Sequence, residues 1–149
     1  MGLTTMKTYV AVFMIVTGLV LGGCQSLHSK PDNTLYLQLG ERDGIANVVE
    51  DLLYLIVDDE RINHQFKGVD VAQFHRNLTD QLCELSGGPC QYSGREIREA
   101  HAAMNITNTQ FNALTENLIL AMEANQIPTA AQNRLIKQLL PLYPDIRHL

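Results

Sequence analysis

Apolar residues recur at intervals of three and four along most of the chain after its first quarter, which is the period of amphipathic helices. The segment 43–59 is apolar on more than one side, so we expect a deeply buried helix there, with Asp43 as its N-cap. The segment 70–85 has a single apolar stripe, and Asp70 with Gln73 forms a capping pair at its start. The stripe consists of Phe74, Leu78, Leu82 and Leu85.

Further helices are marked by their starting residues. Ser93 with Glu96 and Thr107 with Gln110 form capping pairs, and Pro128 stands where proline favours a helix start. No segment shows the strict alternation of a strand. The pattern therefore predicts an all-α fold of about five substantial helices.

The N-terminal part of the chain has a different character. Lys7 is the one charged residue before position 30, and the apolar run 9–21 is too short for a comfortable membrane span. These features are typical of a secretory signal that starts at Met1 or at Met6. The run ends in "LGGC", which resembles the bacterial lipobox, where the cysteine, here Cys24, is acylated and becomes the mature N-terminus. The alternative is an ordinary signal peptide with a chance cysteine.

The sequence thus divides into a lipoprotein signal peptide (1–23), a lipidated N-terminus with a polar tether (24–34) and a folded domain (35–146). Residue 25 is Gln rather than Asp, which by resemblance to known sorting signals implies the outer membrane. We expect a protein of the bacterial cell envelope that faces the periplasm and contacts the membrane through its N-terminal lipid.

Charge and motif content exclude several classes of function. The formal net charge of −5 gives no support for nucleic-acid binding. The chain has no glycine-rich phosphate loop, no paired zinc-ligand spacing and no readable Ser/His/Asp set. The acidic run 58–60 is typical of a solvated surface, and we assign it no role.

Two cysteines remain once Cys24 is assigned to lipid. Cys83 and Cys90 flank the turn in "CELSGGPC", and in an exported protein such a pair suggests a disulfide. Two reduced thiols are an alternative. A metal pair is another, although two ligands alone seldom make a site.

His101 is a candidate ligand for a metal or a cofactor. Read as a helix, "SGREIREAHAAMNIT" puts it on one stripe with Ile97 and Met104, where a core is expected. Burying a histidine without a partner is costly, so it is either a core residue bonded to a backbone carbonyl or a ligand to a metal or cofactor. Imidazole is a common axial ligand of haem iron, and haem needs apolar surroundings, which an all-helical domain supplies.

Several stretches together resemble the group I truncated haemoglobins: "LYLQLGERDGI", "DDERINHQFKGVDVAQF", "SGGPCQYSGREIREAHAAMNIT" and "FNAL". The resemblance covers residues 35 to about 146. The cysteine pair around a Gly-Gly-Pro turn is similar to an exported branch of that family. The resemblance implies a globin-like 2-on-2 α-helical sandwich around haem b.

The resemblance also implies roles for individual residues. His101 matches the proximal iron ligand, so Ile97 and Met104 beside it would meet the porphyrin. Phe66 matches a phenylalanine that packs on the haem, and the glycine pair 87–88 matches the turn after the distal helix.

The distal side departs from the family pattern. Leu53 stands where the family often has a tyrosine, and Tyr54 lies one residue, or about 100°, further round the helix. Phe74 stands at the usual polar position, so we expect an apolar pocket formed with Leu78. The candidates for a polar distal contact are Gln81, His75 and Asn77. The residues expected to contact haem are His101, Phe66, Leu53, Phe74, Leu78, Gln81, Ile97 and Met104.

We therefore expect a lipid-anchored haem protein that reversibly binds oxygen, nitric oxide or another diatomic gas, for carriage, scavenging or sensing. The first alternative is an enzyme for nitric oxide dioxygenation or peroxidase-like turnover, which needs an electron donor that the sequence does not identify. The second is a haem-less globin-fold interaction module. A ligand-binding or transport protein is the expectation, and enzymatic activity stays open.

Overall fold

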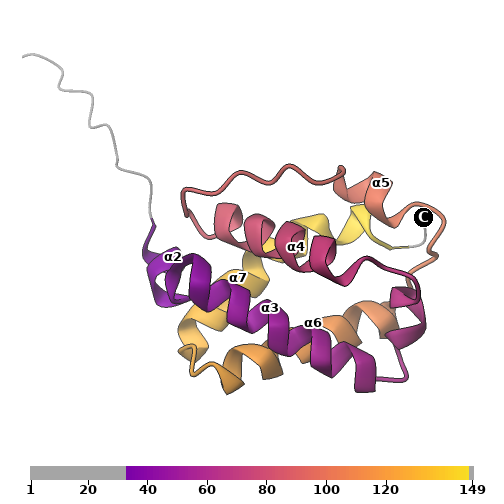
Figure 1. Cartoon of the computed structure of the whole chain (residues 1–149), viewed down its shortest axis with the longest axis horizontal. Coiled ribbons are helices and arrows are strands. Elements are labelled where there is room, and N and C mark those ends of the chain that lie inside the picture. Colours follow the sequence, from indigo (N-terminus) through magenta and orange to yellow (C-terminus); the bar gives the residue numbers. More distant parts are fainter. Residues whose placement is uncertain (1–32, 148–149) are drawn as a thin grey trace, which may run out of the picture. The chain divides into compact units, whose positions relative to one another are not determined.

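The computed structural model describes residues 33–147, which form helices and one isolated bridge between Ile106 and Arg147 (Figure 1). The prediction of an all-α fold is confirmed. The elements are α2 (Thr34–Gln38), α3 (Glu41–Asp58), η1 (Asn63–Phe66), α4 (Val71–Leu85), α5 (Ile97–His101), α6 (Asn108–Ala124), α7 (Thr129–Leu139) and η2 (Leu140–Asp145). Within residues 33–147, no helix has the length and apolar character needed to cross a membrane. The predicted signal peptide, Cys24 and most of the predicted tether lie outside the described residues.

Helix α3 lies at the centre of the fold and packs on both α4 and α6. Two polar contacts show that α3 and α4 run antiparallel, since His75 meets Ala46 while Asp80 meets Arg42. Helix α7 packs on α6, on α4 and on the short α2. The α3/α4 pair and the α6/α7 pair therefore form two layers of two helices (Figure 1).

Helix α3 buries one face rather than several. Its fully buried residues recur at helical spacing and form the centre of the core: Ile45, Val48, Val49, Leu52 and Ile56. Tyr54 and Val57 are 66% and 70% exposed on the outer side. The prediction of a helix buried on more than one side was too strong, because leucines beside the buried stripe, such as Leu53, are only half covered.

Two of the predicted helix starts are confirmed in atomic detail. The Asp70 side chain accepts a hydrogen bond from the Gln73 backbone N–H at 2.9 Å. Thr107 and Gln110 form a reciprocal capping box at the start of α6. Helix α3 instead starts two residues before Asp43.

The start of α3 is set by a glycine. Gly40 is its N-cap with a φ of +81°, a left-handed conformation that glycine adopts without steric cost. The chain therefore turns from α2 into α3 at once, and Asp43 falls inside the first helical turn. A carboxylate there interacts favourably with the helix dipole.

Helix α5 is shorter than the sequence pattern predicts. It begins at Ile97, without a side-chain cap, and ends at His101. Ala103 has a φ of +63° and Asn105 a φ of +50°, and left-handed residues cannot continue a right-handed helix. The predicted shared stripe is therefore wrong for Met104, which lies in the turn beyond the helix.

Candidate functional site

His101, the last residue of α5, has one of its two ring nitrogens engaged. Its Nδ1 lies 2.7 Å from the carbonyl oxygen of Ile97, one helical turn earlier. A carbonyl can only accept, so Nδ1 is the donor, and in the neutral imidazole Nε2 then carries the lone pair. The ring is half buried, and its Nε2 makes no hydrogen bond within residues 33–147. A core histidine would also bond a carbonyl, but this arrangement additionally leaves one nitrogen oriented and free, as a metal ligand requires.

His101 has no partner ligands of its own. Among the described residues there is no cluster of three or more His, Cys, Asp or Glu side chains that could hold a metal ion. A metal bound at Nε2 would take its remaining ligands from outside such a cluster, for example from a cofactor or from water. An iron porphyrin supplies four such nitrogens and takes a single histidine as its axial ligand.

Helix α4 has two differently covered faces. Thr79, Leu82 and Cys83 are buried against the core. On another side, the residues at helical spacing are only half covered: Phe74, Asn77, Leu78, Gln81 and Leu85. An apolar stripe that stays half covered in a folded domain is available to a bound group.

An aromatic side chain of another element lies against this partly covered face. Phe66 of η1 meets Phe74 edge to face, with ring centroids 5.4 Å apart. Phe66, Leu78, Leu114 and Ile119 pack at the margin of the core without being buried. Helices α4 and α5 make no substantial contact with each other within the described residues. The half-covered stripe of α4 and the unbonded Nε2 of His101 are each suited to a flat apolar cofactor with a histidine axial ligand.

The predicted distal residues separate into two groups. Leu53 is half covered, whereas Tyr54 points to solvent, so the tyrosine is no substitute for its neighbour. His75 lies on the core side of α4, where its Nε2 is 3.1 Å from the Ala46 carbonyl oxygen. Asn77 and Gln81 lie on the half-covered face, and their amides have no hydrogen-bond partner among the described residues.

Cys83 and Cys90 form a disulfide with their Cα atoms 5.7 Å apart. The alternatives of two thiols or a metal pair are therefore excluded in this structure. The bridge ties the end of α4 to the connection that leads to α5. That connection is tightly packed, because a Cβ on Gly88 would come within 2.6 Å of both the Cys83 Sγ and the Tyr36 ring.

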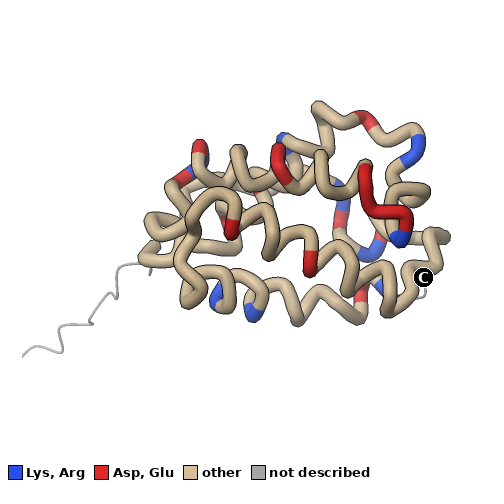
Figure 2. The backbone as a smooth tube through the Cα atoms, turned by 90° about the horizontal axis from the view of Figure 1, so that it is seen from below, with Lys and Arg blue, Asp and Glu red and all other residues tan. Residues whose placement is uncertain are grey.

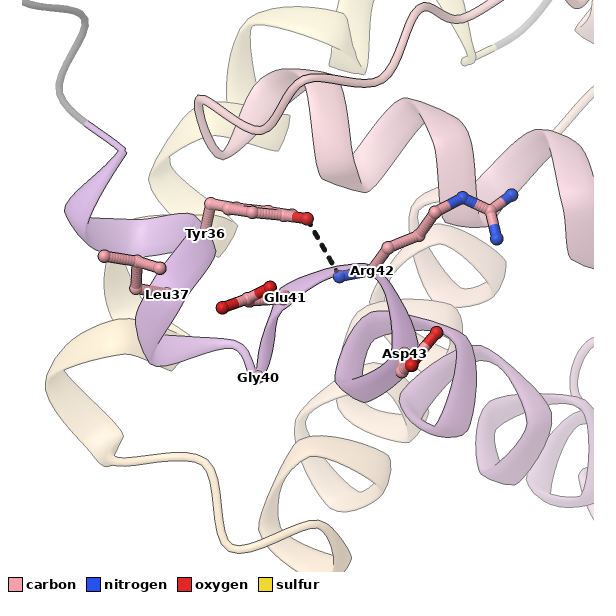
Figure 3. Close-up of a pocket in the computed structure, with 6 residues that line it drawn as sticks. All are labelled: Tyr36, Leu37, Gly40, Glu41, Arg42 and Asp43. Carbon is pink, nitrogen blue, oxygen red and sulfur yellow. Dashed lines mark hydrogen bonds between the residues drawn. The ribbon is translucent and has the colours of Figure 1, made fainter.

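A hollow of about 310 Å³ lies elsewhere, at the turn between α2 and α3 (Figure 3). It is lined by Tyr36, Leu37, Gly40, Glu41, Arg42 and Asp43, and the Tyr36 hydroxyl accepts a hydrogen bond from the Arg42 backbone N–H. None of the predicted site residues lines it. Helices α2 and α5 lie at opposite ends of the view in Figure 1, so the hollow is separate from His101.

Acidic and basic residues are interspersed along the described chain (Figure 2). The most connected charged group is Asp59, which accepts hydrogen bonds from Arg61 and from the Asn117 side chain. The hydrogen bonds from Arg61 hold the pKa of Asp59 well below its usual value. Arg61 also pairs with Glu116 at 2.7 Å. The acidic run to which we assigned no role thus contains a structural link to α6.

Comparison with known proteins decides the family. The family described as "Bacterial-like globin" matches residues 34–147. The chain belongs to this family. The "Group 1 truncated hemoglobin" of Tetrahymena pyriformis is 34% identical over 109 residues, which cover 73% of this chain and 89% of that protein. The "Group 1 truncated hemoglobin GlbN" of a Nostoc species is 33% identical over 90 residues, covering 60% and 76% of the two chains.

Solved structures agree with this assignment. The crystal structure of the Tetrahymena pyriformis truncated haemoglobin in its Fe(III) form matches with a TM-score of 0.75 and 30% identity, over 77% of this chain and 98% of that one. The 2/2 haemoglobin of a Synechococcus species, solved in the cyanomet state with covalently attached haem, matches with a TM-score of 0.66 and 26% identity, over 70% and 89%. The chain is thus a group I truncated haemoglobin with the 2-on-2 globin fold, and haem b is the usual cofactor of this family.

Proposed function

We propose that this globin holds haem b through the Nε2 atom of His101 and binds a diatomic gas on the α4 side. The carrying observation is the His101 ring, in which Nδ1 is fixed by the Ile97 carbonyl and Nε2 has no hydrogen-bond partner among the described residues. When bound, haem iron supplies one open coordination position for a small ligand. The half-covered stripe of α4 supports this proposal, because it offers an apolar surface of the kind that a porphyrin buries.

The proposed role is reversible binding of oxygen or another diatomic gas, for carriage, scavenging or sensing. Leu53, Phe74 and Leu78 would exclude water from the ligand side and offer it no hydrogen bond. Gln81 is the polar group best placed on that stripe to approach a ligand, since its amide has no other partner among the described residues.

The test is the Soret spectrum of the full chain with haem. We expect the parent to take up haem with the spectrum of a histidine-ligated globin, and His101→Ala to lose that spectrum or to show that of loosely held haem. His75→Ala is the matched control, because that imidazole bonds the Ala46 carbonyl instead. An unchanged spectrum in His101→Ala would remove this residue from the site.

We further propose that the protein is anchored by lipid at Cys24, in the bacterial outer membrane, facing the periplasm. The "LGGC" sequence supports the anchor, and the disulfide supports an oxidising compartment outside the cytosol. Acylation predicts that the parent partitions with membranes and takes up labelled fatty acid, and that Cys24→Ser does neither. Equal partitioning of the two proteins without label would contradict the anchor.

A further inference from the structure

Helix α5 is too short to fix its own position. Five residues make little more than one turn, and isolated helices of that length are unstable in water. The left-handed residues Ala103 and Asn105 turn the chain away directly after it. Among the described elements, α5 packs on η2, and no other helix makes a comparable contact with it. Among the described helices, η2 is therefore the main neighbour that can set the orientation of His101, while Gln65 of η1 donates one long hydrogen bond to the Met104 carbonyl in the turn that follows.

The C-terminal segment (residues 143–147) contacts the chain on both sides of His101. Three residues before it, the Arg98 guanidinium pairs with the Asp145 carboxylate at 3.1 Å. Five residues after it, Ile106 forms a parallel bridge with Arg147. The short helix and its exit are thus both held by one stretch of chain.

Tyr143 fixes this segment to helix α6. Its ring meets Phe111 at 4.6 Å between centroids, and its hydroxyl donates a hydrogen bond to Asn108 Oδ1 at 2.7 Å. The Arg147 guanidinium lies over the same ring, 5.0 Å from its centroid. Asn108 and Phe111 belong to the first turn of α6, whose later residues Ala113 and Leu118 are buried in the core. The segment therefore connects α5 to a helix that is buried in the core.

We infer that the C-terminal segment positions His101, with Tyr143 as its anchor. This inference rests on the proposed role of His101 as the axial ligand. Tyr143 and Asp145 act through Arg98 and α5, so they are positioning residues that need no contact with haem. When the anchor is lost, α5 can tilt, and the imidazole then holds iron with a wider range of orientations and a weaker bond.

The test compares substitutions in the segment with matched substitutions elsewhere in the full chain loaded with haem. Tyr143→Leu is paired with Tyr54→Leu, because the Tyr54 side chain is 66% exposed and has no hydrogen bond or ring contact among the described residues. Asp145→Asn is paired with Glu116→Gln, which also removes a surface ion pair, the 2.7 Å contact with Arg61. Tyr143→Phe keeps the ring and removes the hydroxyl.

Two measurements report on the iron–histidine bond: its stretching frequency in the ferrous protein, and the rate of haem transfer to a scavenging apoprotein. We expect Tyr143→Leu to lose haem roughly tenfold faster and to shift or broaden the stretching band. Asp145→Asn should show the same change to a smaller extent, because an exposed ion pair contributes little. Tyr143→Phe should restore most of the parent behaviour, and both controls should match the parent.

The possible failures are distinguishable. If the parent lacks an iron–histidine band, the proposed function fails first. If the parent has the band, and Tyr143→Leu loses haem no faster than Tyr54→Leu, the positioning role is overturned while the axial ligand stands. If Tyr143→Leu does not fold, Asp145→Asn decides, and a band and rate equal to those of Glu116→Gln would overturn the inference.

Discussion

Gln81 and His75 are close in sequence, but their side chains serve different parts of the molecule. His75 bonds the Ala46 carbonyl between α4 and α3, whereas the Gln81 amide has no partner among residues 33–147. A donor near the iron stabilises the partial negative charge that bound oxygen carries, and apolar side chains cannot do so. The distal side should therefore be governed by Leu53, Phe74 and Leu78, with the amides of Gln81 and Asn77 as the unpartnered donors on the half-covered face of α4.

We predict that the iron-bound carbon monoxide stretch of the parent reports an apolar pocket and that oxygen dissociates quickly. Gln81→Leu should change the stretch little, and His75→Leu should leave it unchanged while lowering stability by about 1 kcal/mol through the lost hydrogen bond. A parent stretch that indicates a strong donor, abolished by Gln81→Leu, would show that the pocket is not apolar.

Single residues also show the limit of sequence reading. His101 became a candidate because apolar spacing and family resemblance both pointed to it, and its role as a ligand stays a prediction. His75 bonds a carbonyl that is 29 positions away in the chain, so no local sequence pattern could predict this hydrogen bond. The same holds for Arg98 and Asp145, which are 47 positions apart. Contacts made by exposed polar residues across such separations carry no periodicity, and sequence reasoning missed them.

At the scale of elements, capping pairs predicted helix starts only where the backbone geometry allowed the cap. Thr107 and Gln110 form a capping box at the start of α6, whereas Ser93 and Glu96 do not cap α5, which begins at Ile97. Residues 92–95 form other contacts instead of a helical turn. The Tyr92 hydroxyl donates a hydrogen bond to the Arg95 carbonyl, and Gly94 packs against the Tyr92 ring.

Thr107 and Ser93 should therefore respond differently when each side chain is replaced by alanine. Thr107→Ala should lower the free energy of unfolding by about 1 kcal/mol, because the first turn of α6 loses a hydrogen-bond acceptor. Ser93→Ala should leave stability unchanged within a few tenths of a kcal/mol. Urea denaturation followed by circular dichroism measures both, and equal losses would contradict the assignment of caps.

The connection between α4 and α5 is shaped by a disulfide and not by a periodic pattern of apolar residues. The Cys83–Cys90 disulfide was predicted from the cysteine count and the expected export, and the structure contains it. What the sequence did not reveal is that Gly88 passes so close to the Cys83 Sγ and the Tyr36 ring that a side chain has no room. Gly88 is therefore required for close packing at this turn, whereas Gly87 supplies a left-handed φ of +85°.

At the scale of the whole molecule, the fold follows from amphipathic helices that bury one face each around α3. The long helices α3, α4, α6 and α7 could be read from the sequence because their apolar period extends over many residues, whereas the short α2 was not predicted. The length of α5 could not be predicted either, because Ala103 and Asn105 adopt left-handed conformations that neither residue type predicts. The C-terminal segment compensates for this short helix, so the position of the site depends on the last residues of the domain.

A second long-range connection, centred on Asp59, joins the end of α3 to α6 and should make stability depend on pH. Its side chain is 12% exposed and accepts hydrogen bonds from Arg61 and Asn117. Because these contacts hold the folded-state pKa of Asp59 below its ordinary value of 3.8, the carboxylate stabilises the folded state at pH values above the unfolded-state pKa. This contribution is lost as the pH falls from that value toward the folded-state pKa.

Asp59→Asn should therefore be less stable than the parent at pH 7, and the difference should narrow as the pH falls below about 4. Asp58→Asn is the matched control, because Asp58 is exposed and has no bonded partner among residues 33–147. Urea midpoints measured from pH 7 to pH 2.5 give the comparison. If the difference in stability between the parent and Asp59→Asn stays constant over this range, the variant is destabilised by altered packing or hydrogen-bond geometry and not by the loss of a charge. The link to α6 would then not be electrostatic.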